Sequence, residues 1–203
     1  MSKSIDAANL RTLFDMSRDA LAALDDPVAA RFAAAIPADP GEALHRAPAW
    51  TPGTDALANA RPGARYEDLV ATLQGLAPQL EWRQSYKRSP QMESYLKGYG
   101  YIEFLGQRGH YAPAGAAFGI GVIGPDCLYP THRHGPEEIY LPIAGSAEWS
   151  YDHGPWIRHG AGSVVHTRPW QWHALRTGTE TVVLLYAWLG GDPVNVSEFA
   201  PVA

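Results

Sequence analysis

Residues 129–145 read YPTHRHGPEEIYLPIAG, a segment that combines a histidine pair with a glutamate and a tyrosine. In an extended strand, residues two apart point to the same face of the sheet, so His132 and His134 can aim at one point. After the Gly-Pro bend, Glu138 and Tyr140 are again two apart and share a face. The segment therefore predicts a β-domain whose strands direct several polar side chains to one place.

The two imidazoles and the carboxylate of Glu138 form a candidate metal site. Such groups, joined inside a barrel by a histidine from a distant strand, suit a divalent first-row metal and leave coordination positions open. His173 is the expected further ligand because it follows Pro169 at a predicted strand start, and His166 and His159 are its alternatives. One divalent transition metal (zinc, iron, manganese, cobalt or nickel) is predicted, with no organic cofactor.

From His110 onward, short apolar or alternating runs recur with Gly, Pro and Asp between them. This spacing is typical of an antiparallel sandwich or barrel. The runs cover residues 117–123, 138–143, 147–151, 162–166, 173–175 and 181–189. The sequence therefore predicts a mainly β fold, with a barrel and its metal site in residues 106–203.

The chain before the barrel is predicted to be helical, because apolar residues recur there at three-and-four spacing. Helices are expected over residues 4–24, 26–36 and 69–76. Ser4 is the expected N-cap of the first helix, and Asp26 with Pro27 opens the second. The pattern weakens over residues 81–111, where no element is assigned. Residues 1–105 are thus predicted to form a helical region that packs on the barrel.

The composition narrows the classes of function. The chain has 203 residues, of which 46% are hydrophobic and 18% charged, enough apolar content for one or two folded domains. A net charge of -5 without a Lys/Arg cluster argues against a nucleic-acid partner. The apolar stretch 181–189 is far shorter than the roughly 20 residues that span a bilayer. Residues 1–11 lack the apolar core of a secretory signal, so we expect a cytoplasmic protein with no membrane partner.

The histidine segment resembles the first motif of the cupins, an HxH pair followed by three or four residues, Glu, six residues and Gly. The matching residues are His132, His134, Glu138 and Gly145. The second cupin motif is met more loosely by Pro169 and His173, since the Gly between them is absent and Thr177 replaces the usual Asn. The resemblance implies a single cupin barrel, also called a double-stranded β-helix or jelly roll, here preceded by an N-terminal helical layer.

A narrower resemblance is to the cupin dimethylsulfoniopropionate (DMSP) lyases of the DddQ type, which share the Tyr-Pro-x-His-x-His-x-Pro-Glu-Glu-x-Tyr string of this chain. The metal ligands that this resemblance implies are His134, Glu138, His173 and often Tyr140. It further implies that Tyr140 is the general base, that Tyr129 is a second tyrosine near the substrate, and that Trp188 lines the pocket.

The chemistry of DMSP cleavage accounts for these residue types. The α-proton is removed while dimethyl sulfide leaves the β-carbon, and acrylate is formed. A divalent ion would stabilise the charge that develops beside the carboxylate. A tyrosine, with an ordinary pKa near 10, becomes a usable base once a neighbouring cation lowers that pKa. The sulfonium is attracted to aromatic faces by about 0.5–2 kcal/mol per contact. The candidate aromatic residues are Trp188, Tyr129, Tyr95, Tyr99 and Tyr101.

Three functions therefore stay open. The first is a carbon–sulfur lyase acting on DMSP, and the second is a cupin dioxygenase or isomerase acting on another small carboxylate. The third is a non-catalytic, ligand-binding cupin. Tyr140 and Trp188 could instead pack the barrel core, and the cluster from Tyr95 to Tyr101 could form a lid or pack a helix on the barrel. The sequence leaves the oligomeric state open, with a homodimer among the options.

The remaining polar candidates are expected to have no catalytic role. His45, His110 and His153 are predicted to be solvated or to lie in loops. Glu137 should face solvent, opposite Glu138. The lone Cys127 cannot form an intrachain disulfide and is expected to be a small buried residue.

Overall fold

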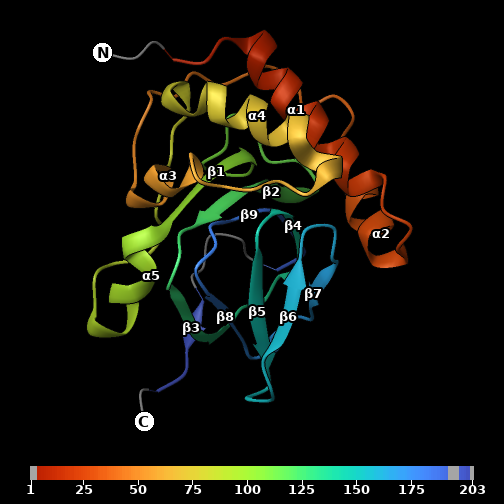
Figure 1. Cartoon of the computed structure of the whole chain (residues 1–203). Coiled ribbons are helices and arrows are strands. Elements are labelled where there is room, and N and C mark those ends of the chain that lie inside the picture. The colour runs from red at the N-terminus through yellow and green to blue at the C-terminus, as the bar shows by residue number, and fades with distance from the viewer. Residues whose placement is uncertain (1–3, 192–196, 202–203) are drawn as a thin grey trace.

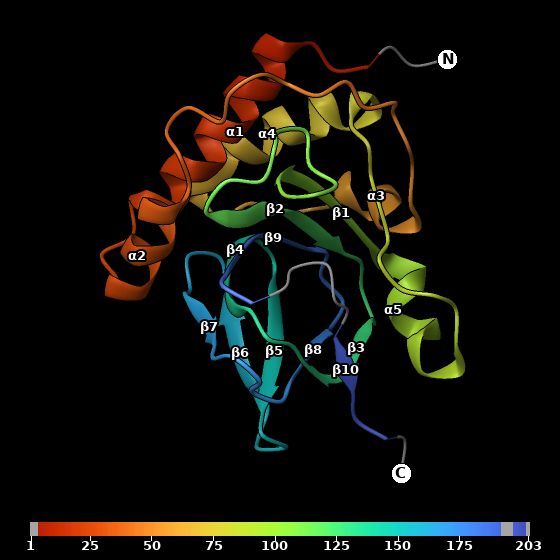
Figure 2. The same ribbon diagram turned by 180° about the vertical axis from the view of Figure 1, so that it is seen from behind.

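Two antiparallel sheets face one another in the computed structural model, which describes residues 4–191 and 197–201 (Figures 1 and 2). The first sheet contains, in spatial order, β1 (Tyr99–Leu105), β2 (Ala116–Ile123), β9 (Val182–Leu189), β4 (Glu137–Ala144) and β7 (Val165–Thr167). The second contains β10 (Glu198–Phe199), β3 (Leu128–Arg133), β8 (His173–Thr177), β5 (Ser146–Tyr151) and β6 (Ile157–Gly160). The predicted fold class is confirmed: the chain is a mainly β, single cupin barrel with an N-terminal helical layer.

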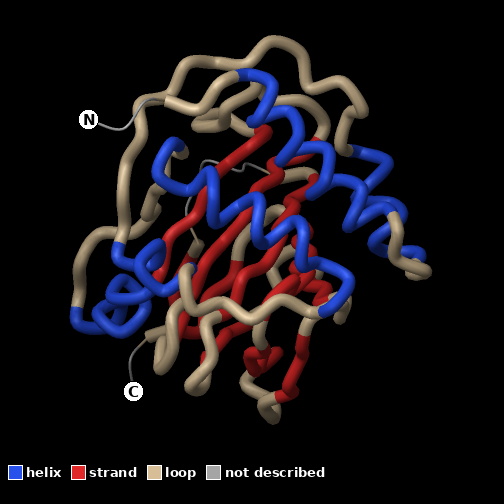
Figure 3. Tube along the Cα trace, turned by 45° about the horizontal axis from the view of Figure 1, so that its top comes forward, coloured by secondary structure: helices blue, strands red, loops and turns tan. Residues whose placement is uncertain are grey.

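The helical layer covers the outer face of the first sheet, and its helices run across the strands on one side of the barrel (Figure 3). Its helices are α1 (Ala7–Ala22), α2 (Pro27–Ala35), α3 (Pro52–Leu57) and α4 (Glu67–Leu76), while α5 (Glu93–Gly98) leads into β1. Short 3₁₀ turns are η1 (Ala64–Tyr66), η2 (Ala77–Gln79) and η3 (Pro90–Met92). The three helices predicted from periodicity thus correspond to α1, α2 and α4.

The caps of the first two helices follow ordinary helix chemistry. Asp26 caps α2 as predicted, since its carboxylate accepts from the backbone N–H groups of Val28 and Ala29 at 2.8 and 2.9 Å. The prediction of Ser4 as the cap of α1 is wrong. Asp6 is the N-cap, and its carboxylate accepts from the backbone N–H of Asn9 at 2.8 Å. Both caps are aspartates because a carboxylate also complements the positive end of the helix dipole.

The first sheet separates an apolar core from the interior of the barrel. Its outer face carries Phe104, Phe118 and Leu141, which are fully buried beneath the helices. Phe14 of α1 meets Phe104 and Phe118 edge to face, with ring centroids 5.8 and 6.0 Å apart. Burial of each such side chain contributes about 1.5–3 kcal/mol. The helical layer therefore holds the sheet from outside and leaves its inner face available for a cavity.

Some elements were not anticipated from the sequence. β1 lies at Tyr99–Leu105, within the region 1–105 that was predicted to be helical, so the barrel's strands begin before residue 106. Its alternation is hard to read because Tyr99, Tyr101 and Glu103 replace aliphatic residues on the inner face. His110 was predicted to be solvated or in a loop: it does lie in the loop between β1 and β2, but it is only 2% exposed, and burial lowers its pKa to about 4.

A search of the described helices found none with the length and apolar character needed to cross a membrane. The division of the chain into a helical region and a barrel domain stays a prediction, although the helices and strands segregate along the chain in that order.

Candidate metal centre

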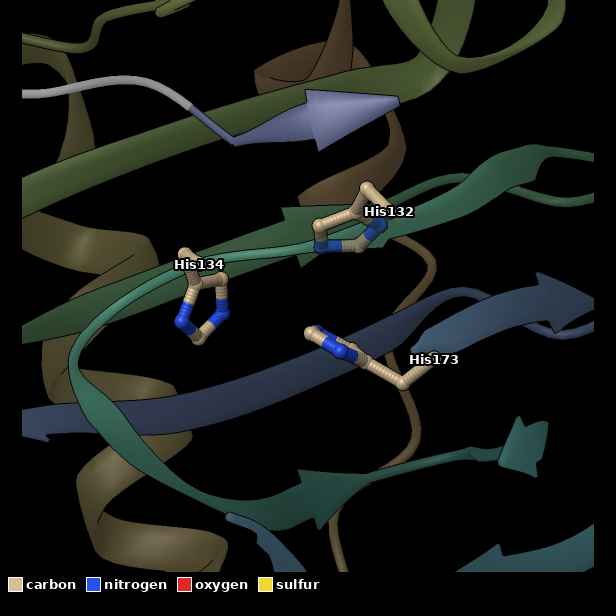
Figure 4. Close-up of side chains that lie close together, drawn as sticks. All are labelled: His132, His134 and His173. Atoms are coloured by element: carbon tan, nitrogen blue, oxygen red, sulfur yellow. The ribbon is translucent and has the colours of Figure 1, made fainter. Parts of the chain in front are cut away.

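Three histidines of the second sheet converge between the two sheets. His132 of β3 is paired in register with His173 of β8, and His134 follows the end of β3 by one residue. Each contributes one ring nitrogen to a group whose nitrogens all lie within 4.8 Å of one another (Figure 4). All three side chains are buried. The structure thus selects His173 as the histidine that joins the pair.

The backbone fixes which nitrogen of each histidine is free. In each ring Nδ1 lies within hydrogen-bond distance of a main-chain carbonyl two residues away: Pro130 at 2.7 Å for His132, Pro136 at 2.9 Å for His134 and Gln171 at 2.9 Å for His173. An Nδ1–H that donates to such a carbonyl leaves the lone pair on Nε2. Nε2 of His132 and of His173 is buried without a hydrogen-bond partner among the described residues.

Glu138 brings a carboxylate to the same group from β4 of the opposite sheet. Its Oε2 lies 3.2 Å from Nε2 of His134 and 3.4 Å from Nε2 of His173. Two donors that each lie about 2.1 Å from one ion are about 3.0–3.4 Å apart, so the spacing suits a shared cation. Oε1 accepts the indole N–H of Trp188. The donor set therefore fits a divalent first-row metal.

The charge states of the group favour a cation. Burial alone would raise the pKa of the Glu138 carboxyl, but the imidazoles of His134 and His173 outweigh burial and hold this pKa well below its usual range. Burial, reinforced by the neighbouring His173, lowers the pKa of His132 well below its usual value. Burial of the His134 ring would in turn lower its pKa, but the Glu138 carboxylate acts in the opposite direction and raises it. A buried carboxylate needs a positive charge beside it, which a protonated imidazole or a bound cation can supply.

The two alternative histidines lie outside this group. Nε2 of His166 is 2.7 Å from Oε1 of Glu137, and His159 packs edge to face on Trp149. Glu137 was predicted to face solvent opposite Glu138. It does point away from Glu138, but its side chain is only 19% exposed, because Arg31 of α2 forms a bidentate ion pair with it at 2.5 and 2.7 Å.

A cavity of about 100 Å³ adjoins Glu138 inside the barrel. Its walls are rich in tyrosine. All the residues predicted to act on or contact substrate line it, namely Tyr140, Tyr129, Trp188, Tyr95 and Tyr99. Tyr86, Tyr101, Tyr186, Glu103 and Arg108 also line it. Of these five, only Tyr101 was a candidate from the sequence.

One wall of the cavity is a column of stacked rings. Tyr129 stacks on His132 with centroids 3.9 Å apart and on Tyr95 at 4.1 Å, and Tyr95 stacks on Tyr99 at 4.2 Å. The Tyr129 hydroxyl is hydrogen-bonded to the hydroxyl of Tyr86. Tyr95 and Tyr129 are both buried. The tyrosines near Tyr95 therefore pack α5 on the barrel and line the cavity at the same time.

Tyr140 lies on the inner face of β4, two residues after Glu138, and opposite Tyr186 of β9. Burial and the adjacent Glu138 carboxylate raise the pKa of the Tyr140 hydroxyl well above its ordinary value. A nearby cation would lower this pKa, and the histidine group that adjoins the cavity at Glu138 is a place that suits one.

The floor of the cavity is a stretch of β2 that has almost no side chains on its inner face. Ala117, Gly119 and Gly121 point inward, while the large residues between them belong to the core beneath the helices. Because residues two apart share a face, this small–large alternation leaves room at Ala117 and Gly121, which line the cavity, while the Tyr186 ring covers Gly119. The same alternation is visible in the sequence and could have indicated a cavity.

We expect Gly119→Ala to destabilise the protein far more than Gly121→Ala. A methyl group at Gly119 would overlap the main-chain oxygen of Ile102, whereas at Gly121 it would meet the flexible end of Leu184 at 3.1 Å. Overpacking against a fixed atom costs about 1–3 kcal/mol. Thermal unfolding of both variants measures the difference, and equal melting temperatures would contradict the close approach of the Ile102 oxygen to Gly119.

Trp188→Phe is expected to weaken metal affinity by about 10–100-fold, because the indole N–H holds the Glu138 carboxylate in place. Competition with a chromophoric chelator measures the affinity. Trp50→Phe is a matched control, since the exposed Trp50 indole also donates to a carboxylate, that of Asp55 at 2.8 Å, but on the surface. Equal affinities of both variants would show that the Trp188 contact does not orient a ligand.

Comparison with known proteins agrees with the barrel and the histidine motif. Residues 25–185 match the DMSP lyase family model. The chain is 33% identical over 128 residues to the putative DMSP lyase DddL of Cereibacter sphaeroides, a match that covers 62% of this chain and 53% of that protein. It is 29% identical over 110 residues to the DMSP lyase DddQ of Ruegeria pomeroyi, covering 54% of this chain and 55% of DddQ. The matched segments span about half the length of these relatives.

Solved structures of the same kind align over nearly the whole chain. A chain from the crystal structures of the DMSP lyases RdDddP and RnDddQII aligns with a TM-score of 0.84 and 26% identity over 96% of this chain and 98% of its own. DddQ from Ruegeria pomeroyi shares the fold, with a TM-score of 0.81 and 22% identity over 96% and 97% of the two chains. Because the family model covers most of the sequence, the histidine motif included, this chain belongs to the dimethylsulfoniopropionate lyase family.

Proposed function

We propose that the protein is a carbon–sulfur lyase that cleaves DMSP to dimethyl sulfide and acrylate by base-catalysed β-elimination. The observation that carries this proposal is the position of Tyr140. Its hydroxyl belongs to a cavity that Glu138 also lines, beside three buried histidines, in a chain of the DMSP lyase family. A potential base next to a potential cation site is what removal of an α-proton requires.

The metal would be held by His132, His134, His173 and Glu138, with Tyr140 as a further ligand. A bound divalent ion would act as a Lewis acid toward the substrate carboxylate, which makes the α-proton more acidic. The protein's own contribution is to present three Nε2 lone pairs and one carboxylate oxygen within a buried group. Zinc, iron, manganese, cobalt and nickel all accept this donor set.

In the proposed reaction the oxygen of Tyr140 takes the α-proton. The C–H electron pair forms the new double bond between the α- and β-carbons, the bond between the β-carbon and sulfur breaks, and dimethyl sulfide leaves with the electron pair of that C–S bond. Acrylate remains, so no oxidant or reductant is needed. The Tyr140 hydroxyl has a raised pKa when only Glu138 is near it, and this makes its activity as a base dependent on the cation.

The remaining aromatic residues would orient the substrate. Tyr129, Tyr95, Tyr99 and Trp188 line the cavity and supply faces for the sulfonium. The cavity of about 100 Å³ suits a small acyclic acid better than a sugar or a nucleotide.

Headspace detection of dimethyl sulfide tests the proposal directly. Protein purified without chelator is loaded in turn with each candidate divalent metal and given DMSP. Stoichiometric dimethyl sulfide and acrylate are expected with at least one metal and not with chelator-treated protein. Oxygen uptake that depends on Fe(II), without dimethyl sulfide, would instead identify a dioxygenase. Binding of the acid without turnover would identify a ligand-binding cupin.

The proposed partner of the chain is thus a small molecule. The cytoplasmic location and the homodimer considered from the sequence stay predictions.

A further inference from the structure

Glu103 is a second acidic residue in the same cavity, on a different strand from Glu138. Strand register places it in a row across the first sheet: Glu103 of β1 is opposite Gly119 of β2, which is opposite Tyr186 of β9, which is opposite Tyr140 of β4. With neighbouring strands about 4.8 Å apart, the backbones of β1 and β4 are separated by about 14 Å. The cavity therefore has two carboxylates, one on β4 (Glu138) and one on β1 (Glu103).

The carboxylate of Glu103 is only partly satisfied by the protein. Its Oε1 accepts the backbone N–H of Arg108 at 2.9 Å, while Oε2 makes no hydrogen bond or ion pair with the described residues. Arg108 is exposed and also lines the cavity. Its pKa is raised mainly by Tyr101, with smaller contributions from Glu103 and Tyr186, so its guanidinium lies near all three, but it forms no ion pair with Glu103 within 4.0 Å. Burial raises the pKa of Glu103, although the charges of Arg108, Arg83 and Arg46 partly offset this.

The wall between Glu103 and Tyr140 is formed by Tyr186. Because Gly119 has no side chain, the Tyr186 ring lies across it, so close that a methyl group at Gly119 would come within 2.7 Å of the ring and hydroxyl. The Tyr186 hydroxyl is buried and has no hydrogen-bond partner among the described residues. Tyr101 meets this ring edge to face at 6.2 Å. Aromatic faces and an unpaired carboxylate are the groups that attract an onium ion.

We infer that Glu103, with Tyr186 and Tyr101, forms a subsite for the positively charged end of a zwitterionic acid. The inference rests on the proposed function for the placement of the acid's carboxylate at the metal centre. The cavity is then positive at the metal and negative at Glu103, which complements a small acid with a fixed cation. Uncharged acids of the same shape leave Oε2 of Glu103 without a partner and bind less well.

A matched pair of ligands isolates the charge. 3-(Trimethylammonio)propionate and 4,4-dimethylpentanoate have the same shape and differ by one positive charge. Calorimetry on metal-loaded protein gives the dissociation constant of each, and their ratio, neutral over cationic, measures selectivity for charge. Glu103→Gln keeps the oxygen that accepts the Arg108 N–H but removes the negative charge. We expect it to lower this ratio by about tenfold, which corresponds to about 1.4 kcal/mol.

Arg108→Gln is expected to change the ratio of dissociation constants in the opposite direction. It removes a positive charge near the subsite and keeps the backbone N–H that binds Glu103, so we expect the ratio to rise, by less than tenfold because Arg108 is exposed. An unchanged ratio in Glu103→Gln, equal weakening of both ligands, or no binding of either ligand to the wild type would overturn the inference.

Failure of the proposed function gives a different result. If the wild type releases no dimethyl sulfide but Glu103→Gln still lowers the ratio, the onium subsite stands and the lyase proposal falls. If dimethyl sulfide is released and the ratio does not change, the lyase stands and the role of Glu103 falls.

Discussion

Tyr140→Phe is expected to lower the rate of dimethyl sulfide release by about 10²–10⁴-fold, the range that a positioned general base contributes. The substitution removes one oxygen from a ring that lines the cavity on the inner face of β4. His132, His134, His173 and Glu138, four of the five proposed ligands, remain, so the metal content of protein loaded with excess metal, measured by mass spectrometry, should stay near that of the wild type. The loss should therefore appear in turnover and not in loading.

Tyr66→Phe is the matched control for this prediction. Tyr66 is also buried, and its hydroxyl has no hydrogen-bond partner among the described residues, but it belongs to the core beneath the helices. Removal of that hydroxyl should leave turnover within about twofold of the wild type, because Tyr66 does not line the cavity and so would not contact the substrate. Turnover close to wild type in Tyr140→Phe would exclude Tyr140 as the base.

His173→Ala is expected to abolish both metal binding and lyase activity. The imidazole is buried, with Nε2 3.4 Å from the Glu138 carboxylate, and it comes from a strand that supplies no other member of the group. Loss of a residue that only hydrogen-bonds to a metal ligand weakens metal affinity by about 10–100-fold, and loss of a direct ligand should weaken it further. Titration with cobalt, followed by its visible absorption, measures the affinity.

His166→Ala is the control for this second prediction. His166 contacts Glu137 on the side of β4 that faces away from Glu138, so its removal should leave cobalt binding and turnover in place. Stoichiometric cobalt and normal turnover in His173→Ala would contradict the proposed ligand set. A loss of cobalt binding in both variants would point to a general loss of structure, which the circular dichroism of each variant tests.

The elements that were predicted well from the sequence are those in which apolar residues recur with a strong periodicity. α1, α2 and α4 each have an apolar stripe, and β2, β4, β5, β8 and β9 fall within or close to the runs expected from alternation. The histidine motif was also readable, because the spacing of His132, His134 and Glu138 depends only on local strand geometry. His173 lies about 40 residues further along the chain, so local spacing alone does not place it beside the pair. The pairing of β3 with β8 brings it opposite His132.

The cavity was harder to predict because its residues come from many elements. Tyr86 lies in a loop, Tyr186 in an apolar strand and Glu103 in a strand that was not assigned. The strands that line the cavity carry aromatic or polar side chains on their inner faces, where strands of an apolar core carry aliphatic ones. This weakens the hydrophobic alternation by which strands are recognised in a sequence. Short edge strands such as β6 have few buried residues and give little signal.

The ion pair between Arg31 and Glu137 has a consequence for the metal centre. Glu137 and Glu138 are identical neighbours, and a slip of β4 by one residue would send Glu137 to the histidines and Ile139 into the cavity. In the structure Ile139 lies beneath the helices, and Arg31 of α2 holds Glu137 outside. Arg31 is half exposed and contributes at most about 1 kcal/mol to stability. Together with the burial of Ile139, this ion pair connects the helical layer to the register of β4 in which Glu138, and not Glu137, reaches the histidines.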